Sequence, residues 1–168
     1  MIVLANNATD LLIEIHLTDQ RLLVYDNATP VFCCPVSTGA NGPGEIVDSG
    51  CTPRGWHEIC EKIGTGCSEN TVFLGRVKTG ELYSKELATA HPERDWILTR
   101  ILWLSGREPG FNCGGNCDTR SRYIYLHGTP AETNMGVPGS HGCVRLSNSD
   151  VIRVYDMVFV GTRVNILE

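Results

Sequence analysis

The sequence contains no hydrophobic run long enough to cross a membrane and no cluster of lysine or arginine residues. A membrane-spanning helix needs about 20 consecutive apolar residues, and binding to nucleic acid or to an anionic membrane surface needs concentrated positive charge. The formal net charge is instead −5 at pH 7. The sequence therefore argues against a membrane span, and against a nucleic acid or a membrane surface as the partner.

A secretory signal is also missing from the N-terminus. The apolar patch Ile2–Ala5 is short and has no basic residue before it, whereas a signal peptide combines a basic start with a longer apolar region. We therefore expect a cytoplasmic protein. The alternative is a periplasmic protein from which the signal has been removed.

Internal repeats, linkers and low-complexity stretches are absent as well. The 168 residues and the hydrophobic content of 42% suit one domain with a substantial core. We expect a single domain over residues 1–168.

Many short apolar segments with period-2 alternation predict a mostly β domain. A short helix is expected behind Ser147, which resembles an N-cap, and it should end at Gly161. Residues 81–90 form a second short helix or an irregular insert. The polar, glycine-rich segment 105–122 is predicted to be a loop that leans over the functional site. The expected strands are 11–17, 22–25, 31–36, 56–59, 72–77, 96–104, 123–127 and 162–167.

The segment Ile124–Asn148 combines the features that a cysteine nucleophile needs. His127 closes a predicted strand, Gly128 lets the chain turn, and Cys143 follows a Gly/Pro loop. We place Cys143 just before the predicted helix, whose positive N-terminal end would favour a thiolate, as would a protonated histidine. Alone, Cys143 would be interpreted as a small buried apolar residue and His127 as a locally satisfied strand residue. The joint pattern favours catalysis.

The same segment resembles the L,D-transpeptidase catalytic domain family, also called the YkuD or ErfK/YbiS/YcfS/YnhG family. The resemblance rests on His127-Gly128-Thr129 followed by Ser140-His141-Gly142-Cys143-Val144-Arg145. It extends over nearly the whole chain from about residue 11. Weaker matching elements are 11–25, 35–39, 52–55 and 161–164.

The resemblance implies a mixed β-sandwich with one short helix after the catalytic cysteine, and no metal or cofactor. It also implies a substrate, the tetrapeptide stem of peptidoglycan. The thiol would attack the carbonyl at the L-centre of the third residue, typically diaminopimelate, and expel the terminal D-Ala. An amine acceptor would give a 3-3 cross-link, and water would give L,D-carboxypeptidase activity. Covalent labelling of the cysteine by carbapenems is expected too.

We assign roles to the residues of the motif. Cys143 is the predicted nucleophile, and His127 either accepts its proton or holds it as an ion pair with the thiolate. The backbone N–H groups of Gly142 and Cys143 are expected to form an oxyanion hole. His141 is expected to shape the pocket. Arg145 either makes bidentate hydrogen bonds to a substrate carboxylate or forms a structural ion pair. The remaining predicted substrate-binding residues are Ser140, Gly128 and Tyr125.

Water is the favoured acceptor, which would make the protein an L,D-carboxypeptidase of muropeptide recycling. The missing export signal and the many thiols suit a reducing compartment, and the loop 105–122 could exclude a bulky second stem. Cross-linking with an amine acceptor is the alternative.

The sequence has eight cysteines, of which seven remain beside the predicted nucleophile. An odd number fits a complete disulfide framework poorly, so reduced thiols are expected. A zinc site is an alternative with little support, because the spacings match no recognised finger pattern. A papain-type protease is disfavoured because its cysteine precedes its histidine, and a non-catalytic wall-binding module stays open. The seven are Cys33, Cys34, Cys51, Cys60, Cys67, Cys113 and Cys117, of which the last five are the candidate zinc ligands.

Overall fold

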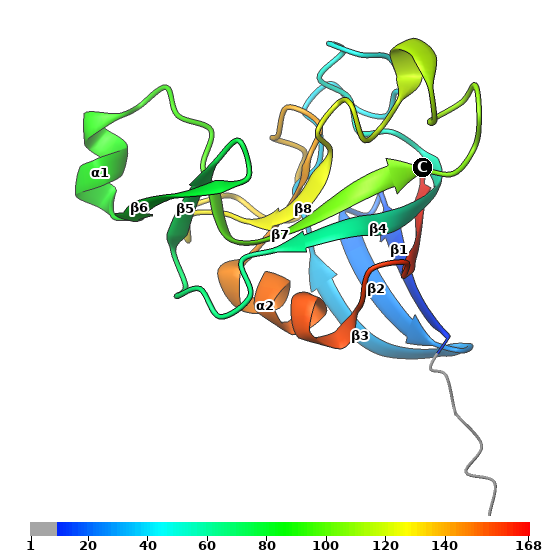
Figure 1. Ribbon diagram of the computed structural model, residues 1–168, viewed down its shortest axis with the longest axis horizontal. Helices are drawn as coiled ribbons and strands as arrows, with labels where there is room; N and C mark the ends of the chain where they lie inside the picture. Colours follow the sequence, from blue (N-terminus) through cyan, green and yellow to red (C-terminus); the bar gives the residue numbers. More distant parts are fainter. Residues whose placement is uncertain (1–9) are drawn as a thin grey trace, which may run out of the picture.

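The computed structural model describes residues 10–168 and shows a mostly β protein, as predicted (Figure 1). The two α-helices are α1 (Lys85–Ala90) and α2 (Asn148–Met157), with a 3-10 turn at Gly115–Cys117. The strands are β1 (Leu11–His16), β2 (Arg21–Asp26), β3 (Thr29–Pro35), β4 (Gly55–Ile63), β5 (Thr71–Leu74), β6 (Val77–Leu82), β7 (Ile97–Gly106), β8 (Tyr125–Gly128), β9 (Val144–Leu146) and β10 (Arg163–Leu167). No helix within residues 10–168 is long and apolar enough to span a membrane.

The strands form one mixed, continuous hydrogen-bonded sheet in the order β3-β2-β1-β10-β4-β7-β5-β6. β7 joins its parts because it pairs with β4, β5 and β8, and β8 in turn pairs with β9. Two pairs are parallel, β1 with β10 and β8 with β9. Side chains from β1, β2 and β10 share one hydrophobic core with side chains from β8 and β9. The two parts of the sheet therefore enclose that core like the layers of a sandwich.

Helix α2 closes the core from below β7 in Figure 1. The Ser147 hydroxyl accepts a hydrogen bond from the Asp150 N–H at 3.1 Å, so the predicted N-cap is confirmed. Val151, Val154 and Tyr155 are buried at helical spacing. The helix ends at Met157, earlier than predicted. Lys62 donates to the carbonyls of Tyr155 and Val158 at 2.7 and 2.6 Å and so satisfies two acceptors there.

The strand predicted over 72–77 is wrong, because this segment is a hairpin. β5 ends at Leu74 and β6 begins at Val77. Gly75 and Arg76 between them have φ values of +53° and +67°, the pair of left-handed residues that a tight hairpin turn requires. The apolar residues on both sides of the turn had suggested one uninterrupted strand. The hairpin and α1 extend away from the rest of the sheet (Figure 1).

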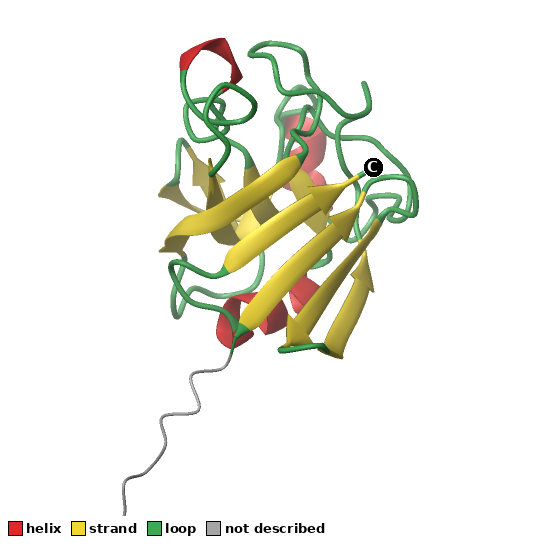
Figure 2. Cartoon of the chain, turned by 90° about the vertical axis from the view of Figure 1, so that its right-hand side faces the viewer, coloured by secondary structure: helices red, strands yellow, loops and turns green. Residues whose placement is uncertain are grey.

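The long loops gather at one end of the strands (Figures 1 and 2). Ser37 forms an antiparallel bridge with Arg145, and Gly39 forms a parallel bridge with Ser140. The Arg122 guanidinium donates to the Cys51 carbonyl at 2.7 Å. Segments that are far apart in the sequence are thereby fixed around the predicted catalytic motif.

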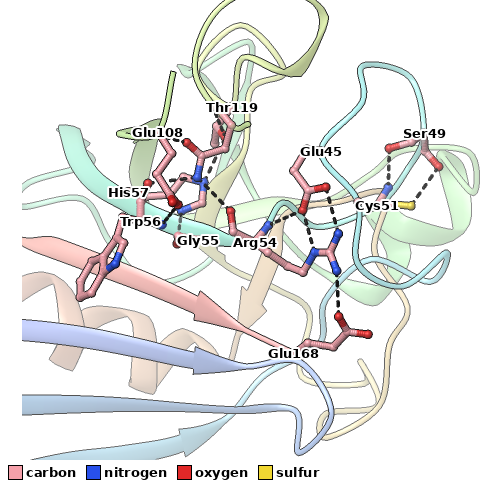
Figure 3. A network of polar contacts seen from close by, with 12 residues as sticks. Glu45, Ser49, Cys51, Arg54, Gly55, Trp56, His57, Glu108, Thr119 and Glu168 are labelled. Atoms are coloured by element: carbon pink, nitrogen blue, oxygen red, sulfur yellow. Dashed lines mark hydrogen bonds and ion pairs between the residues drawn. The ribbon is translucent and has the colours of Figure 1, made fainter. Parts of the chain in front are cut away.

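A second polar network lies on β4, and Figure 3 shows it. His57 is 1% exposed, with Nδ1 2.9 Å from the Gly55 carbonyl and Nε2 3.0 Å from the Thr119 hydroxyl. Burial lowers the pKa of His57 to about 4. The Trp56 N–H donates to the Glu108 carboxylate at 2.7 Å. These bonds tie β4 to the loop 107–124, so His57 is a structural residue.

Because the folded protein keeps His57 neutral, stability should fall as the pH drops below the ordinary histidine pKa of about 6.5. The unfolded chain binds the proton in that range, whereas the folded chain resists it down to a pKa of about 4. Between pH 7 and pH 5, the free energy of unfolding should fall by about 2 kcal/mol less in His57→Gln than in the parent protein. Urea denaturation at the two pH values measures this. Equal losses in the two proteins would contradict it.

Candidate active site

The parallel register of β8 and β9 decides which side chains share a face. Leu126 pairs with Val144, and His127 pairs with Arg145. Leu126 and Val144 are fully buried in the main core. Because side chains alternate along a strand, His127 and Cys143 lie on the opposite face, on a diagonal of roughly 8 Å between their Cα atoms by ordinary strand spacing. The two predicted catalytic residues are thus neighbours on one surface of the sheet.

Cys143 is half-buried and its thiol is held by two backbone groups. The Tyr125 N–H donates to the sulfur at 3.4 Å, and the thiol donates to the Tyr123 carbonyl at 3.3 Å. Burial raises the pKa of Cys143 to about 12, although the Tyr125 N–H and the charge of Arg145 oppose the rise. The resting group is therefore a neutral thiol. A base is needed to remove its proton.

Cys143 precedes the helix with its N-cap at Ser147, as predicted, but it does not lie next to the helix terminus. Strand β9 and Ser147 stand between Cys143 and the first residue of α2, Asn148. The field of a helix terminus falls off within about one turn, so it does not reach the sulfur. The sequence signal was ambiguous because β9 is only three residues long.

His127 is fully buried and its two ring nitrogens have different environments. Nδ1 lies 2.7 Å from the Gly128 carbonyl, which can only accept, so Nδ1 carries the proton. Nε2 is buried and has no hydrogen-bond partner within residues 10–168. Burial lowers the pKa of His127, and the charge of Asp95 opposes the fall. The imidazole is therefore neutral, with the lone pair of Nε2 free to accept a proton.

A cavity of about 500 Å³ opens beside the thiol. Three of the predicted site residues line it, namely Cys143, Tyr125 and His141. The other predicted residues are not among its lining residues, and these are His127, Gly142, Ser140, Gly128 and Arg145. Arg122, the last residue of the loop expected to lean over the site, is part of the wall. The remaining lining residues are Gly75, Arg76, Asp95, Ile97, Tyr123 and Ile124.

The turn before Cys143 requires glycine. Gly142 has a φ of +127°, and a Cβ there would lie 2.9 Å from the Cys51 carbonyl oxygen. The Ser140 hydroxyl accepts the Gly142 N–H at 3.1 Å and donates to the Cys143 carbonyl. One of the two predicted oxyanion donors is thus engaged within its own turn. A contact of the Gly142 N–H with an oxyanion stays a prediction, and it requires the hydrogen bond to the Ser140 hydroxyl to break.

A family model for the YkuD L,D-transpeptidase catalytic domain matches residues 10–166. The chain belongs to this family. Its mostly β fold, with the helix after the cysteine, agrees with the solved structures of L,D-transpeptidases.

Three relatives show the extent of the similarity. "Probable L,D-transpeptidase ErfK/SrfK" of Salmonella typhimurium is 28% identical over 93% of this chain and 44% of its own length. L,D-transpeptidase 3 of Mycobacterium tuberculosis, in complex with a faropenem-derived adduct, has a TM-score of 0.59 at 16% identity, over 95% of this chain and 61% of that one. An L,D-transpeptidase from Mycobacterium smegmatis has a TM-score of 0.56 at 18% identity, over 95% and 59%. The chain thus spans less than two thirds of these proteins.

Asp95 is a residue of this L,D-transpeptidase domain's site that the sequence did not indicate. Its carboxylate lies 2.9 Å from Arg145 Nη2 and 3.6 Å from His141 Nδ1. Burial raises the pKa of Asp95, but neighbouring cationic groups, among them the Arg145 guanidinium that donates to it, outweigh burial and hold the pKa below its usual value. Of the two interpretations of Arg145, this structure shows the structural ion pair. The polar turn before β7 carries no pattern that would single out Asp95.

Thr52 is the second unexpected residue, and its hydroxyl joins three segments. It accepts the Gly39 N–H at 2.8 Å and donates to the Gly142 carbonyl at 2.8 Å. Thr52 is fully buried. It therefore holds the turn of the predicted nucleophile against the loop that follows β3.

Thr52→Val should leave the Gly39 N–H and the Gly142 carbonyl without partners. Each unsatisfied buried group costs about 1–3 kcal/mol, so for the two groups we expect a loss of about 2–6 kcal/mol in unfolding free energy by urea denaturation. Thr52→Ser keeps the hydroxyl and is the matched control, with a loss of about 1 kcal/mol for the methyl group. A valine variant as stable as the serine variant would refute the role.

Removal of the Asp95 charge should make the Cys143 thiol more reactive. Burial is the main cause of the raised pKa of Cys143, and the negative charge of Asp95 adds to it. We expect Asp95→Asn to increase the rate of iodoacetamide labelling at Cys143 a few-fold at pH 8, followed by peptide mass spectrometry. Glu93→Gln, on the same segment but outside the lining of the thiol's cavity, serves as the control. A rate that is unchanged or slower in Asp95→Asn would count against this electrostatic account.

Proposed function

We propose that this L,D-transpeptidase-family enzyme performs cysteine-dependent acyl transfer on peptidoglycan stem tetrapeptides. Cys143 would attack the carbonyl at the L-centre of the third residue and release the terminal D-Ala. Water would resolve the thioester, which makes the activity that of an L,D-carboxypeptidase. The observation that carries the proposal is the neutral thiol of Cys143 on the same sheet face as the unpartnered Nε2 of His127.

His127 Nε2 takes up a proton and gives it back in each half of the reaction. The sulfur of Cys143 bonds to the substrate carbonyl carbon while its proton passes to His127 Nε2. The tetrahedral intermediate then collapses, the C–N bond breaks, and the amine of D-Ala leaves with that proton. In the second half, Nε2 takes a proton from water, the hydroxide attacks the thioester, and the thiolate leaves and is reprotonated. Thiolate and imidazolium exist only transiently.

Burial opposes separated charges in these steps, because it raises the pKa of Cys143 and lowers that of His127. The proton would therefore leave the thiol only as the sulfur bonds to the carbonyl carbon, and the unpartnered lone pair of Nε2 would accept it. The Gly128 carbonyl holds Nδ1–H and would stabilise the imidazolium while the proton resides on the ring. The Cys143 N–H remains the predicted oxyanion donor.

The choice of water as acceptor rests on the thiols and is part of the proposal. All eight cysteines are unpaired, which suits a reducing compartment such as the cytoplasm, where soluble stem peptides would be the substrate. Within residues 10–168 no group of cysteine, histidine and acidic side chains is arranged to hold a metal. Cross-linking with an amine acceptor is the second candidate, because the relatives are named as transpeptidases.

Digestion of a soluble muropeptide tetrapeptide, with and without an amine acceptor, tests the proposal by mass spectrometry. We expect tripeptide and free D-Ala in both reactions. Cys143→Ala and His127→Gln should each reduce turnover at least about a thousandfold, because nucleophile and base act as one unit. The alanine variant should stay folded, because a half-buried thiol contributes little packing. Peptide dimers in place of tripeptide would overturn the choice of water.

Labelling by a carbapenem separates an enzyme from a non-catalytic wall-binding module. An active acylating cysteine should give a covalent adduct on the Cys143 peptide of the reduced protein. Cys51→Ala, which removes another half-buried thiol, should label like the parent. A parent protein without an adduct would favour the binding module.

A further inference from the structure

The arginines that line the cavity or lie near it differ in how many of their guanidinium donors are used. Arg122 donates to the carbonyls of Gly44, Glu45 and Cys51 and to the Ser49 hydroxyl. The donors of the Arg122 guanidinium are therefore engaged by the protein's own groups.

The other two arginines complete the comparison. Arg145 donates to the Gly139 carbonyl and to Asp95. Arg76 makes one hydrogen bond, to the Tyr125 hydroxyl at 2.9 Å, and no ion pair with any carboxylate of the described chain. A guanidinium has five N–H donors. Arg76 is thus the cavity-lining arginine whose charge and donors are left for a ligand.

Aromatic rings hold Arg76 in place. It lies in the turn between β5 and β6, with its guanidinium carbon 4.4 Å from the centroid of Trp103 and 4.9 Å from that of Tyr123. Such stacking uses the faces of the planar group and leaves its edges to donate. The side chain is ordered before a ligand arrives, so little conformational entropy is lost on binding.

Tyr125 gives the distance from Arg76 to the reacting atoms. Its N–H contacts the Cys143 sulfur, and its hydroxyl contacts Arg76. The guanidinium and the thiol are therefore separated by about the length of one tyrosine side chain, along one cavity. Two carboxylates of the stem tetrapeptide fall within that reach of the scissile carbonyl, that of the leaving residue and that on the side chain of the third residue.

We propose that Arg76 is a specificity-determining residue that binds a carboxylate of the stem peptide beside Cys143. This inference rests on the proposed function. It adds that the enzyme selects its substrate by a fixed, aromatic-stacked positive charge on the β5–β6 turn.

A substrate–variant cycle tests the proposal. The parent protein, Arg76→Gln and Arg76→Lys are each assayed for tripeptide release on three tetrapeptides. One is unmodified, one carries a terminal carboxamide, and one carries an amide on the third residue's side-chain carboxyl. We expect Arg76→Gln to lower kcat/KM on the unmodified peptide about ten- to hundredfold, the range of a lost charge-assisted hydrogen bond. On one of the two amidated peptides, the parent and Arg76→Gln should have equal kcat/KM values. The carboxylate that this peptide lacks is then the one that Arg76 binds. Arg76→Lys should recover part of the activity.

Arg120→Gln is the matched control, because Arg120 also stacks on Trp103, at 5.1 Å, but does not line the cavity. It should behave like the parent on all three peptides. Equal losses for Arg76→Gln on all three peptides, or no loss on any, would overturn the role of Arg76. Failure of the parent to release tripeptide at all would instead refute the proposed function, so the two failures are distinguishable.

Discussion

The parallel register between β8 and β9 is the constraint on which the site depends. A slip of β9 by one residue against β8 would turn Cys143 towards the core and bring Val144 out to the cavity, while His127 on β8 stayed in place. The fully buried Val144 and Leu146 prevent such a slip, because exposing them would cost burial of two large side chains. Packing of the core thus fixes the relative placement of nucleophile and base.

The loops add a second level of order. The chain turns sharply at Gly142. Only glycine fits there, because a Cβ would lie 2.9 Å from the Cys51 carbonyl oxygen. The Thr52 hydroxyl then connects this turn to the loop after β3. A rigid turn matters because a nucleophile must be held near its reacting geometry.

Much of the fold followed from local patterns. The strand that ends near His127 and the N-cap at Ser147 were predictable, because alternation and capping are properties of adjacent residues. The hairpin at Gly75 and Arg76 was missed, since apolar residues flank it without a break. Asp95 and Thr52 were missed for another reason. Their roles depend on partners about 50 or more residues away in sequence, such as Arg145 and Gly142, and spacing in a single sequence does not encode such contacts.

The resting thiol of Cys143 is neutral, unlike the thiolate that a helix terminus or a protonated histidine would favour. Burial favours the neutral forms of both Cys143 and His127, and β9 separates the thiol from the helix terminus. Long-range ¹H–¹⁵N NMR of the histidine ring nitrogens measures the central claim directly. We predict that His127 is neutral at pH 7, with its proton on Nδ1, in the parent protein and in Cys143→Ala. A doubly protonated His127 at pH 7 that loses its charge when Cys143 is replaced would contradict the account.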